Sequence, residues 1–216
     1  LELSFRQHSE IGHLKVGATL SIGNYLAVNI LAQFTREHPN AKVSLEVANT
    51  TAIAHQVRNY LLDIGLIEGD WNEPELDVIH WRRDELVVFC SAEHPLAEHG
   101  DLTDQDLVSV PWILRETGSG TRQTFERAMH GILPKLNIAL ELQHTEAIKR
   151  AVEANLGIGC LSKITLVEAF KRGNLVPLNV PHRHFNRDLS FILHKKKYRS
   201  AGLNNWLALC QRPEFH

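Results

Sequence analysis

The stretch LKVGATLSIGNYLAVNILAQFTREHP, residues Leu14–Pro39, decides the fold because a strand pattern runs directly into a helix pattern. Apolar and polar residues alternate at its start with the period of a strand, and Thr19 and Ser21 follow in a polar turn. A long helix is expected next, with the Ser21 side chain capping its first turn and Pro39 stopping it. This order of elements is typical of α/β proteins.

The turn between this strand and helix also has the features of an anion-binding site. A helix N-terminus presents backbone N–H groups without partners and a partial positive charge. The hydroxyls of Thr19 and Ser21 stand beside that N-terminus in the sequence. We therefore predict a cup for a small anion at this turn.

The expected helix carries apolar residues around more of its circumference than one core-facing stripe requires. One side is expected to pack on the sheet of its own chain. The other side is expected to form a homodimer contact, with a deeper core as the alternative. The apolar residues concerned are Ile22, Tyr25, Leu26, Val28, Ile30, Leu31 and Phe34.

Length and composition bound the class of protein. A chain of 216 residues with 44% hydrophobic content can form one large domain or two small ones. No run approaches the ~18 apolar residues of a membrane span, and residues 1–13 lack the apolar core of a secretory signal, so a cytoplasmic protein is expected. Cys90, Cys160 and Cys210 are widely spaced, and we predict reduced, buried thiols.

Charge and motif content argue against several functions. A surface that binds DNA phosphates normally carries a clear excess of Lys and Arg, and the net charge of -2 argues against such a surface in this chain. No metal site or cofactor is expected, since the histidines lack acidic or cysteine neighbours at ligand spacing. The motifs GxSxG, HExxH, GxxxxGK[ST] and GxGxxG are absent, so the chain is predicted not to be an enzyme. Asp84 and Glu85 are interpreted as solvated surface acids.

The pattern of a strand followed by a polar turn and a helix recurs along the chain. Residues 42–47 form a second alternating strand before a polar turn, and residues 111–116 form another. Two α/β lobes, joined by crossovers near 76–91 and 189–194, would place these turns around a shared cleft. Arg115 and Arg122 could add charge there or be surface residues. The predicted ligand-binding residues are Thr19, Ser21, Asn49, Thr50, Thr51, Gly118, Ser119, Gly120 and Thr121.

The chain resembles the effector-binding domain of LysR-type transcriptional regulators over residues 12–211. The resemblance rests on the order of blocks LKVGATLSIGNYL, DIGLIEG, DELVVFCSAEHPLA, PWILRETGSGTR and LGIGCLSK, and it is nearest to the branch that regulates sulfur assimilation. It implies two Rossmann-like subdomains joined by two crossover strands, similar to type 2 periplasmic binding proteins. Residues 13–89 with 189–216 would form subdomain I, residues 90–188 subdomain II, and residues 1–12 the end of a linker helix.

The resemblance also implies partners. Thr19 and Ser21 match the first-loop ligand positions, Thr50 or Thr51 the second, and Ser119 to Thr121 those of the other lobe. The effector would be a small anion, with sulfate or sulfite favoured by neutral hydroxyl and N–H donors. The first long helix would form a dimer, extended to a tetramer in the whole regulator, and DNA would be bound by an N-terminal helix-turn-helix domain absent here. The alternative is a solute-binding protein of a transport system.

Overall fold

The computed structural model describes residues 12–216, and these residues form two compact units. Unit 1 comprises residues 12–82 and Asp188–His216, and unit 2 comprises Arg83–Arg187. The chain passes into unit 2 within strand β4 (Leu76–Ser91) and returns within β9 (Asn186–His194). The first boundary, between Arg82 and Arg83, falls earlier than the expected 89/90, and both positions lie inside one continuous strand. The expected linker helix at 1–12 lies almost wholly outside the described residues.

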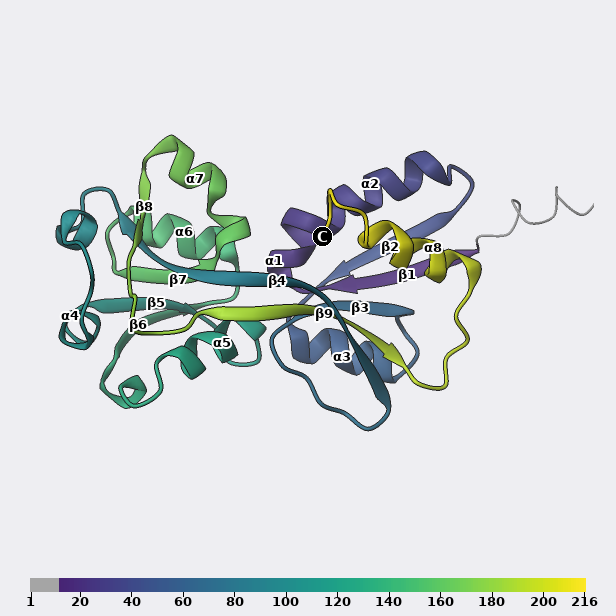
Figure 1. The fold of residues 1–216 in the computed structure, drawn as a ribbon, viewed down its shortest axis with the longest axis horizontal. Coiled ribbons are helices and arrows are strands. Elements are labelled where there is room, and N and C mark those ends of the chain that lie inside the picture. Colours follow the sequence, from purple (N-terminus) through teal and green to yellow (C-terminus); the bar gives the residue numbers. More distant parts are fainter. Residues whose placement is uncertain (1–11) are drawn as a thin grey trace, which may run out of the picture. The chain divides into compact units, whose positions relative to one another are not determined.

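Unit 1 contains a mixed sheet with helices on both faces (Figure 1). The order is β2-β1-β3-β9, in which β1 is parallel to β2 and β3, and β9 is antiparallel to β3. Its other elements are β1 (His13–Ala18), α1 (Leu20–Ile22), η2 (Gly23–Ala27), α2 (Val28–Glu37), β2 (Lys42–Val47), α3 (Thr50–Arg58), β3 (Ile64–Glu68) and α8 (Ala201–Cys210).

The first long helix is continuous through α1, η2 and α2, and it contains a wide π turn at η2. The buried positions of this helix include Ile22, Gly23 and Ala27 around the π turn and continue through Ile30 and Phe34 in α2. On the second apolar side, Val28 remains 48% exposed. The breadth of apolar surface noticed in the sequence is therefore only partly explained by the core of unit 1.

The core of unit 1 includes large aromatic side chains between the sheet and α8. The Phe34 and Trp206 ring centroids are 5.6 Å apart, so α2 packs on α8. Trp81 stacks on Phe191 at 5.1 Å and donates its indole N–H to the carbonyl of Cys210 at 2.9 Å. On the opposite face, α3 buries Ile53 and Val57 against the sheet.

Unit 2 is a second mixed sheet, in the order β8-β4-β7-β5-β6. Strand β5 is parallel to β6 and β7, while β4 is antiparallel to β7 and β8. The elements are η3 (Pro95–Glu98), α4 (Asp104–Val108), β5 (Pro111–Arg115), α5 (Gly120–Ala128), η4 (Leu133–Lys135), β6 (Asn137–Leu142), α6 (Thr145–Glu153), β7 (Ile158–Ser162), η5 (Lys163–Thr165), α7 (Val167–Arg172) and β8 (Leu175–Leu178).

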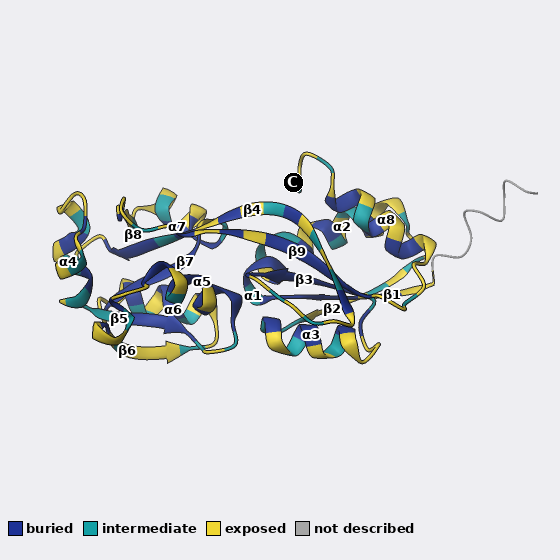
Figure 2. Ribbon diagram, turned by 60° about the horizontal axis from the view of Figure 1, so that its bottom comes forward, coloured by how far each residue is buried: buried dark blue, intermediate teal, exposed yellow. Residues whose placement is uncertain are grey.

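Alternation along β5 divides unit 2 into two cores. Trp112 and Leu114 pack with Phe125 of α5 on one face, and Ile113 packs with Ile148 and Val152 of α6 on the other. Figure 2 shows the contrast between the fully buried central strand β7 and the largely exposed edge strand β6. Both units thus have the doubly wound character expected from the sequence.

Candidate functional site

Unit 1 brings its two predicted ligand loops, which follow β1 and β2, to one edge of the sheet beside the end of β3. The register pairs Ala18 of β1 with Val47 of β2 and with Leu66 of β3, so the carboxyl ends of these parallel strands are neighbours. The Thr19 amide donates to the carbonyl of Leu66 at 3.0 Å. This is the edge at which open α/β sheets bind ligands.

Thr19 and Ser21 are the most informative residues at this edge. Thr19 is 1% exposed and Ser21 is 2% exposed, and neither hydroxyl oxygen has a hydrogen-bond partner among the described residues. The expectation that Ser21 caps the helix is wrong. The helix begins at Leu20 with Thr19 at the N-cap, and the Thr19 side chain makes no capping bond. Two buried hydroxyls at a helix start are therefore left without a structural task.

The second predicted loop behaves differently. The Asn49 side chain accepts from the Ala52 amide at 3.0 Å and so caps α3. The buried Thr50 hydroxyl donates to the Glu68 carbonyl at 3.4 Å, while Thr51 is exposed. Glu68 itself is 1% exposed, which places a buried carboxyl group at the same edge. Glu68 carries no signal in the sequence, where it is simply the last residue of an expected buried strand.

In unit 2, the predicted residues surround the N-terminus of α5. Gly118 has a φ of +97°, a conformation that favours glycine, and it leads into Ser119, whose side chain accepts from the Arg122 amide at 2.9 Å. Gly120 begins the helix and is buried. Thr121 is also buried, and its hydroxyl oxygen accepts from Arg187 Nη1 at 3.1 Å.

Thr121 belongs to a buried network that sequence reasoning missed. Arg187 Nε donates to Asp84 Oδ2 at 2.7 Å, and Ser162 donates to Asp84 Oδ1 at 2.9 Å. The side chains of Asp84 and Arg187 are only 2% and 1% exposed. The interpretation of Asp84 as a solvated acid is therefore wrong, although Glu85 is exposed. The partners are 78 to 103 residues apart in sequence, so no local spacing could have revealed the network.

Arg115 and Arg122 are both buried, so their interpretation as surface residues is wrong. Arg122 donates to the Arg115 carbonyl at 2.8 Å, and it bonds Glu126 at 2.9 Å and Glu141 at 3.0 Å. These bonds tie the end of β5 to α5 and β6. Arg115 donates from Nε to Glu116 at 2.8 Å.

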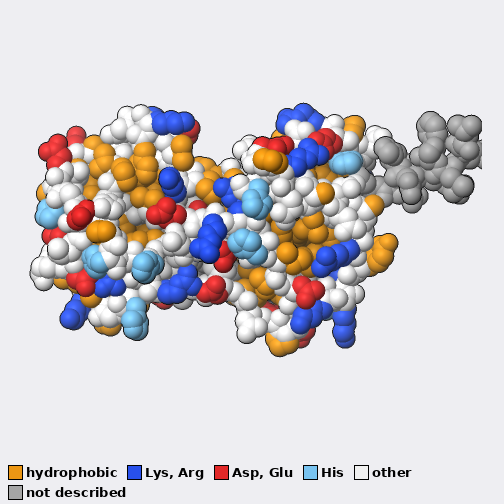
Figure 3. All heavy atoms as spheres, in the orientation of Figure 1, with side chains coloured by type: hydrophobic (Ala, Val, Ile, Leu, Met, Phe, Trp, Pro, Cys, Tyr) orange, Lys and Arg blue, Asp and Glu red, His pale blue; other side chains and the backbone are white. Residues whose placement is uncertain are grey.

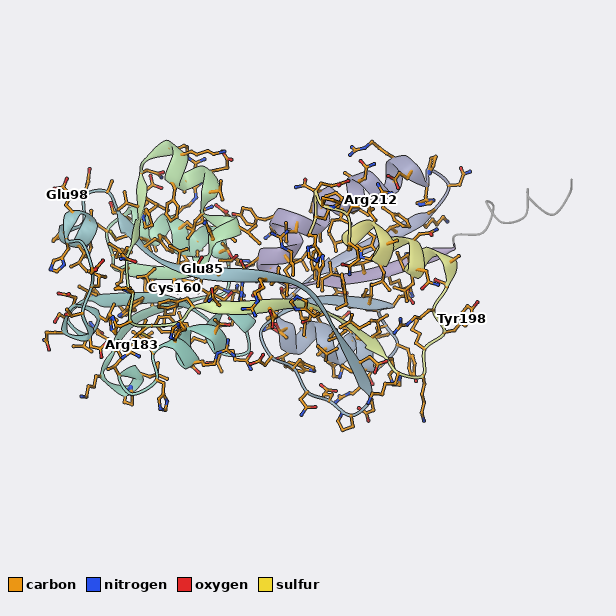
Figure 4. The ribbon with its side chains drawn as sticks, viewed as in Figure 1. Glu85, Glu98, Cys160, Arg183, Tyr198 and Arg212 are labelled. Carbon is orange, nitrogen blue, oxygen red and sulfur yellow. The ribbon has the colours of Figure 1, made fainter. Side chains whose placement is uncertain are left out.

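The three thiols are unsuited to nucleophilic chemistry. All are buried and free, as predicted from their spacing. Burial raises the pKa of Cys90 to about 11 and raises the pKa values of Cys160 (labelled in Figure 4) and Cys210 as well. A protonated thiol is a poor nucleophile. Within residues 12–216, no group of three or more His, Cys, Asp and Glu side chains is placed to hold a metal ion.

On the face drawn in Figure 3, Lys and Arg side chains are interspersed with Asp and Glu. None of the described helices has the length and apolar character needed to cross a membrane.

Comparison with known proteins places this geometry in a family. The family model described as "LysR substrate binding domain" matches residues 7–213. The chain belongs to this family. It is therefore similar to the effector-binding domains of LysR-type transcriptional regulators, with the mixed α/β fold expected from the resemblance to type 2 periplasmic binding proteins.

Curated relatives of this LysR-family chain are named as regulators. The uncharacterized HTH-type transcriptional regulator YeiE of Escherichia coli K12 is 37% identical over 210 residues, covering 97% of this chain and 71% of that protein. The HTH-type transcriptional regulator CysL of Bacillus subtilis is 31% identical, covering 88% of this chain and 64% of that protein. The alternative of a transport solute-binding protein is wrong on these matches.

Solved structures share the fold of the LysR-family chain. The regulatory domain of CcmR from Synechocystis PCC6803, in complex with 2-PG, superposes with a TM-score of 0.85 at 28% identity and covers 93% of this chain and 96% of that one. The effector-binding domain of QuiR, in complex with shikimate, has a TM-score of 0.82 at 21% identity, with coverages of 94% and 97%, and shows the common fold.

Proposed function

We propose that the chain is the sensing domain of a cytoplasmic LysR-type transcription factor and that it binds a small oxyanion through the hydroxyls of Thr19 and Ser21. One observation carries the proposal: both hydroxyls are buried at a helix N-terminus and lack a hydrogen-bond partner among the described residues. Burying a hydroxyl without a partner costs about 1–3 kcal/mol. An anion at this edge would accept hydrogen bonds from both groups.

The chemistry of the donors selects the ligand. Neutral hydroxyl and backbone N–H donors suit a compact anion with several acceptor oxygens. The branch that the sequence resembles makes sulfate and sulfite the first probes. Asn49 to Thr51, at the same edge of unit 1, and Gly118 to Thr121, in unit 2, are the other predicted ligand-binding residues. Anion binding would then change how the whole regulator holds DNA, by an amount limited by the difference in affinity between its two states.

A thermal-shift titration tests the anion site. Sulfite and sulfate are added to the wild-type chain at constant ionic strength, because sulfate at high concentration stabilises proteins generally. At 100 times the dissociation constant, binding stabilises by about 2.7 kcal/mol, which corresponds to a rise in melting temperature of roughly 5–10 °C. The combined variant Thr19→Val and Ser21→Ala is expected to lose this rise.

The matched control is Thr35→Val, which removes an exposed hydroxyl from α2, about four turns beyond the site. It is expected to keep the full response to the anion. An equal response of the wild type, the control and the double variant would refute the assignment of Thr19 and Ser21.

We also propose that the first long helix forms the homodimer contact. Its second apolar side is incompletely covered, since Val28 is 48% exposed and Tyr25, Leu26 and Leu31 are only half-buried. Val28→Asp would place a charge on this face and is expected to shift the protein toward monomer in sedimentation experiments. The control Asn29→Asp changes the neighbouring exposed position. A concentration-independent monomer in the wild type would contradict the proposal.

A further inference from the structure

The carboxyl end of β5 carries a cation with unused hydrogen-bonding capacity. Arg115 is 1% exposed, and one of its terminal nitrogens, Nη1, is buried without a hydrogen-bond partner among the described residues. Its Nε is bonded to Glu116 at 2.8 Å, so the side chain is held in place. A buried donor on a charged group without an acceptor is more costly than a neutral one. Such an unused donor is a reason to look for a ligand.

The position of Arg115 in the sheet shows what lies beside it. Ile113 packs under α6, and side chains alternate along a strand, so Arg115 lies on the same face of the sheet as Ile113. The register pairs Arg115 with Leu142, the last residue of β6. From Leu142 the chain reaches Thr145, the first residue of α6, in three residues. Arg115 is therefore close to the N-terminus of α6.

The start of α6 has its own unused donor. Thr145 is 2% exposed, and its hydroxyl oxygen has no partner among the described residues. The N-cap residue His144 makes no side-chain capping bond, although α6 continues for nine residues. Its first amides and its partial positive charge are therefore without a capping side chain.

The surrounding charges favour an anion. Lys149 lies one turn further along α6 and is 8% exposed, and its Nζ donates to the Thr165 carbonyl at 2.8 Å and to Glu146 at 3.0 Å. Glu116 is the acid paired with Arg115 and Glu146 is the acid paired with Lys149, and the Glu146 side chain is 61% exposed. The end of β5 and the first turns of α6 thus carry two buried cations and a helix N-terminus, with one partly buried and one largely exposed carboxylate paired to the cations.

We propose that Arg115 Nη1, Thr145 Oγ1 and the first amides of α6 bind a small oxyanion or carboxylate. This subsite is contained in unit 2, and it goes beyond the hydroxyl cup of Thr19 and Ser21. The planar guanidinium recognises oxygens arranged as in carboxylate or sulfite, and Thr145 supplies a hydrogen bond at a second oxygen. The cost of leaving both donors buried is recovered when the anion accepts from them.

The experiment is calorimetric titration of the whole chain with sulfite and, separately, with acetate. Thr145→Val removes the hydroxyl while conserving shape. Because this hydroxyl has no protein partner, the unliganded melting temperature is expected to stay the same or to rise. The affinity for the bound anion is expected to fall about 10- to 100-fold, as for loss of a hydrogen bond to a charged group. Arg115→Lys keeps the positive charge but loses the paired N–H donors of the guanidinium, so this variant is also expected to bind the anion more weakly.

The control Thr117→Val removes an exposed hydroxyl from the loop after β5 and is expected to bind like the wild type. Wild-type affinity in both Thr145→Val and Arg115→Lys would overturn the inference, and Thr145→Val decides alone if Arg115→Lys fails to fold. Ser21→Ala separates the two proposals. Unchanged binding in Ser21→Ala with loss in Thr145→Val refutes the cup and supports this subsite, and the reverse pattern refutes this subsite.

Discussion

The two units differ in the hydrogen bonding of a buried threonine at the carboxyl edge of each sheet. In unit 1, the threonine at the start of the helix, Thr19, is buried with no partner for its hydroxyl. In unit 2, the buried threonine in the corresponding turn, Thr121, accepts from Arg187, which in turn is paired with Asp84. A threonine hydroxyl in the same kind of turn thus has no hydrogen-bond partner in unit 1, whereas in unit 2 it is bonded to an arginine of the buried network. Hydroxyl residues at helix starts indicate a ligand only when the fold gives them no other task.

The largest expected effect comes from breaking the network of unit 2. Asp84→Ala removes the carboxylate and leaves the Arg187 guanidinium buried without its counter-charge. We expect a loss of about 3–5 kcal/mol in the free energy of unfolding, measured by urea denaturation. Glu85→Ala, at the exposed neighbour, is expected to change it by less than about 0.5 kcal/mol. Equal effects of the two variants would contradict a buried ion pair.

The two threonines provide the sharpest test of the comparison. Thr121→Val leaves Arg187 Nη1 without this acceptor and is expected to cost about 1–3 kcal/mol in the absence of ligand. Thr19→Val removes a hydroxyl that has no protein partner and is expected to be neutral or slightly stabilising. Urea denaturation of both variants in buffer free of multivalent anions measures the difference. A larger loss in Thr19→Val would reverse the conclusion.

Glu68 tests the charge balance of the unit 1 edge. Its buried carboxyl group lies at the edge that carries Thr19 and Thr50, where a negative charge would repel an anion. Glu68→Gln keeps the shape and removes the charge, so sulfite affinity is expected to rise about tenfold, which is equivalent to about 1.4 kcal/mol. Calorimetric titration measures the change, with the exposed Glu46→Gln as the control. Weaker binding in Glu68→Gln would show that the carboxylate orients the ligand site.

The smallest expected effect is the acid sensitivity of a surface cluster in unit 2. The Asp104 carboxylate bonds Arg183, labelled in Figure 4, and His182, and these contacts lower its pKa from 3.8 to about 2. A lowered pKa in the folded state contributes stability above pH ~4, and this contribution is lost as the pH falls toward 2. The difference in urea midpoint between wild type and Asp104→Asn is therefore expected to shrink between pH 5 and pH 2.5. A difference that grows on acidification would be inconsistent with this pairing.

The sequence by itself determined the elements and the family. Alternation predicted the strand at 42–47, and a short run before a polar turn predicted the strand at 111–116 to within a residue. Polar turns predicted helix starts near Thr50 and Gly120, because these signals depend on neighbours in the chain. The block order LKVGATLSIGNYL to LGIGCLSK identified the LysR family, which the match over residues 7–213 confirms.

Only the tertiary structure decided which polar groups have hydrogen-bond partners within the protein. Nothing in the local sequence distinguishes Ser119, which caps α5, from Ser21, which caps nothing. Likewise, Asp84 reads like a surface acid until Arg187, 103 residues later, is seen bonded to it. Hydrogen-bond satisfaction depends on burial and on partners distant in sequence, so the unused donors of Thr19, Arg115 and Thr145 become visible only when the chain is folded.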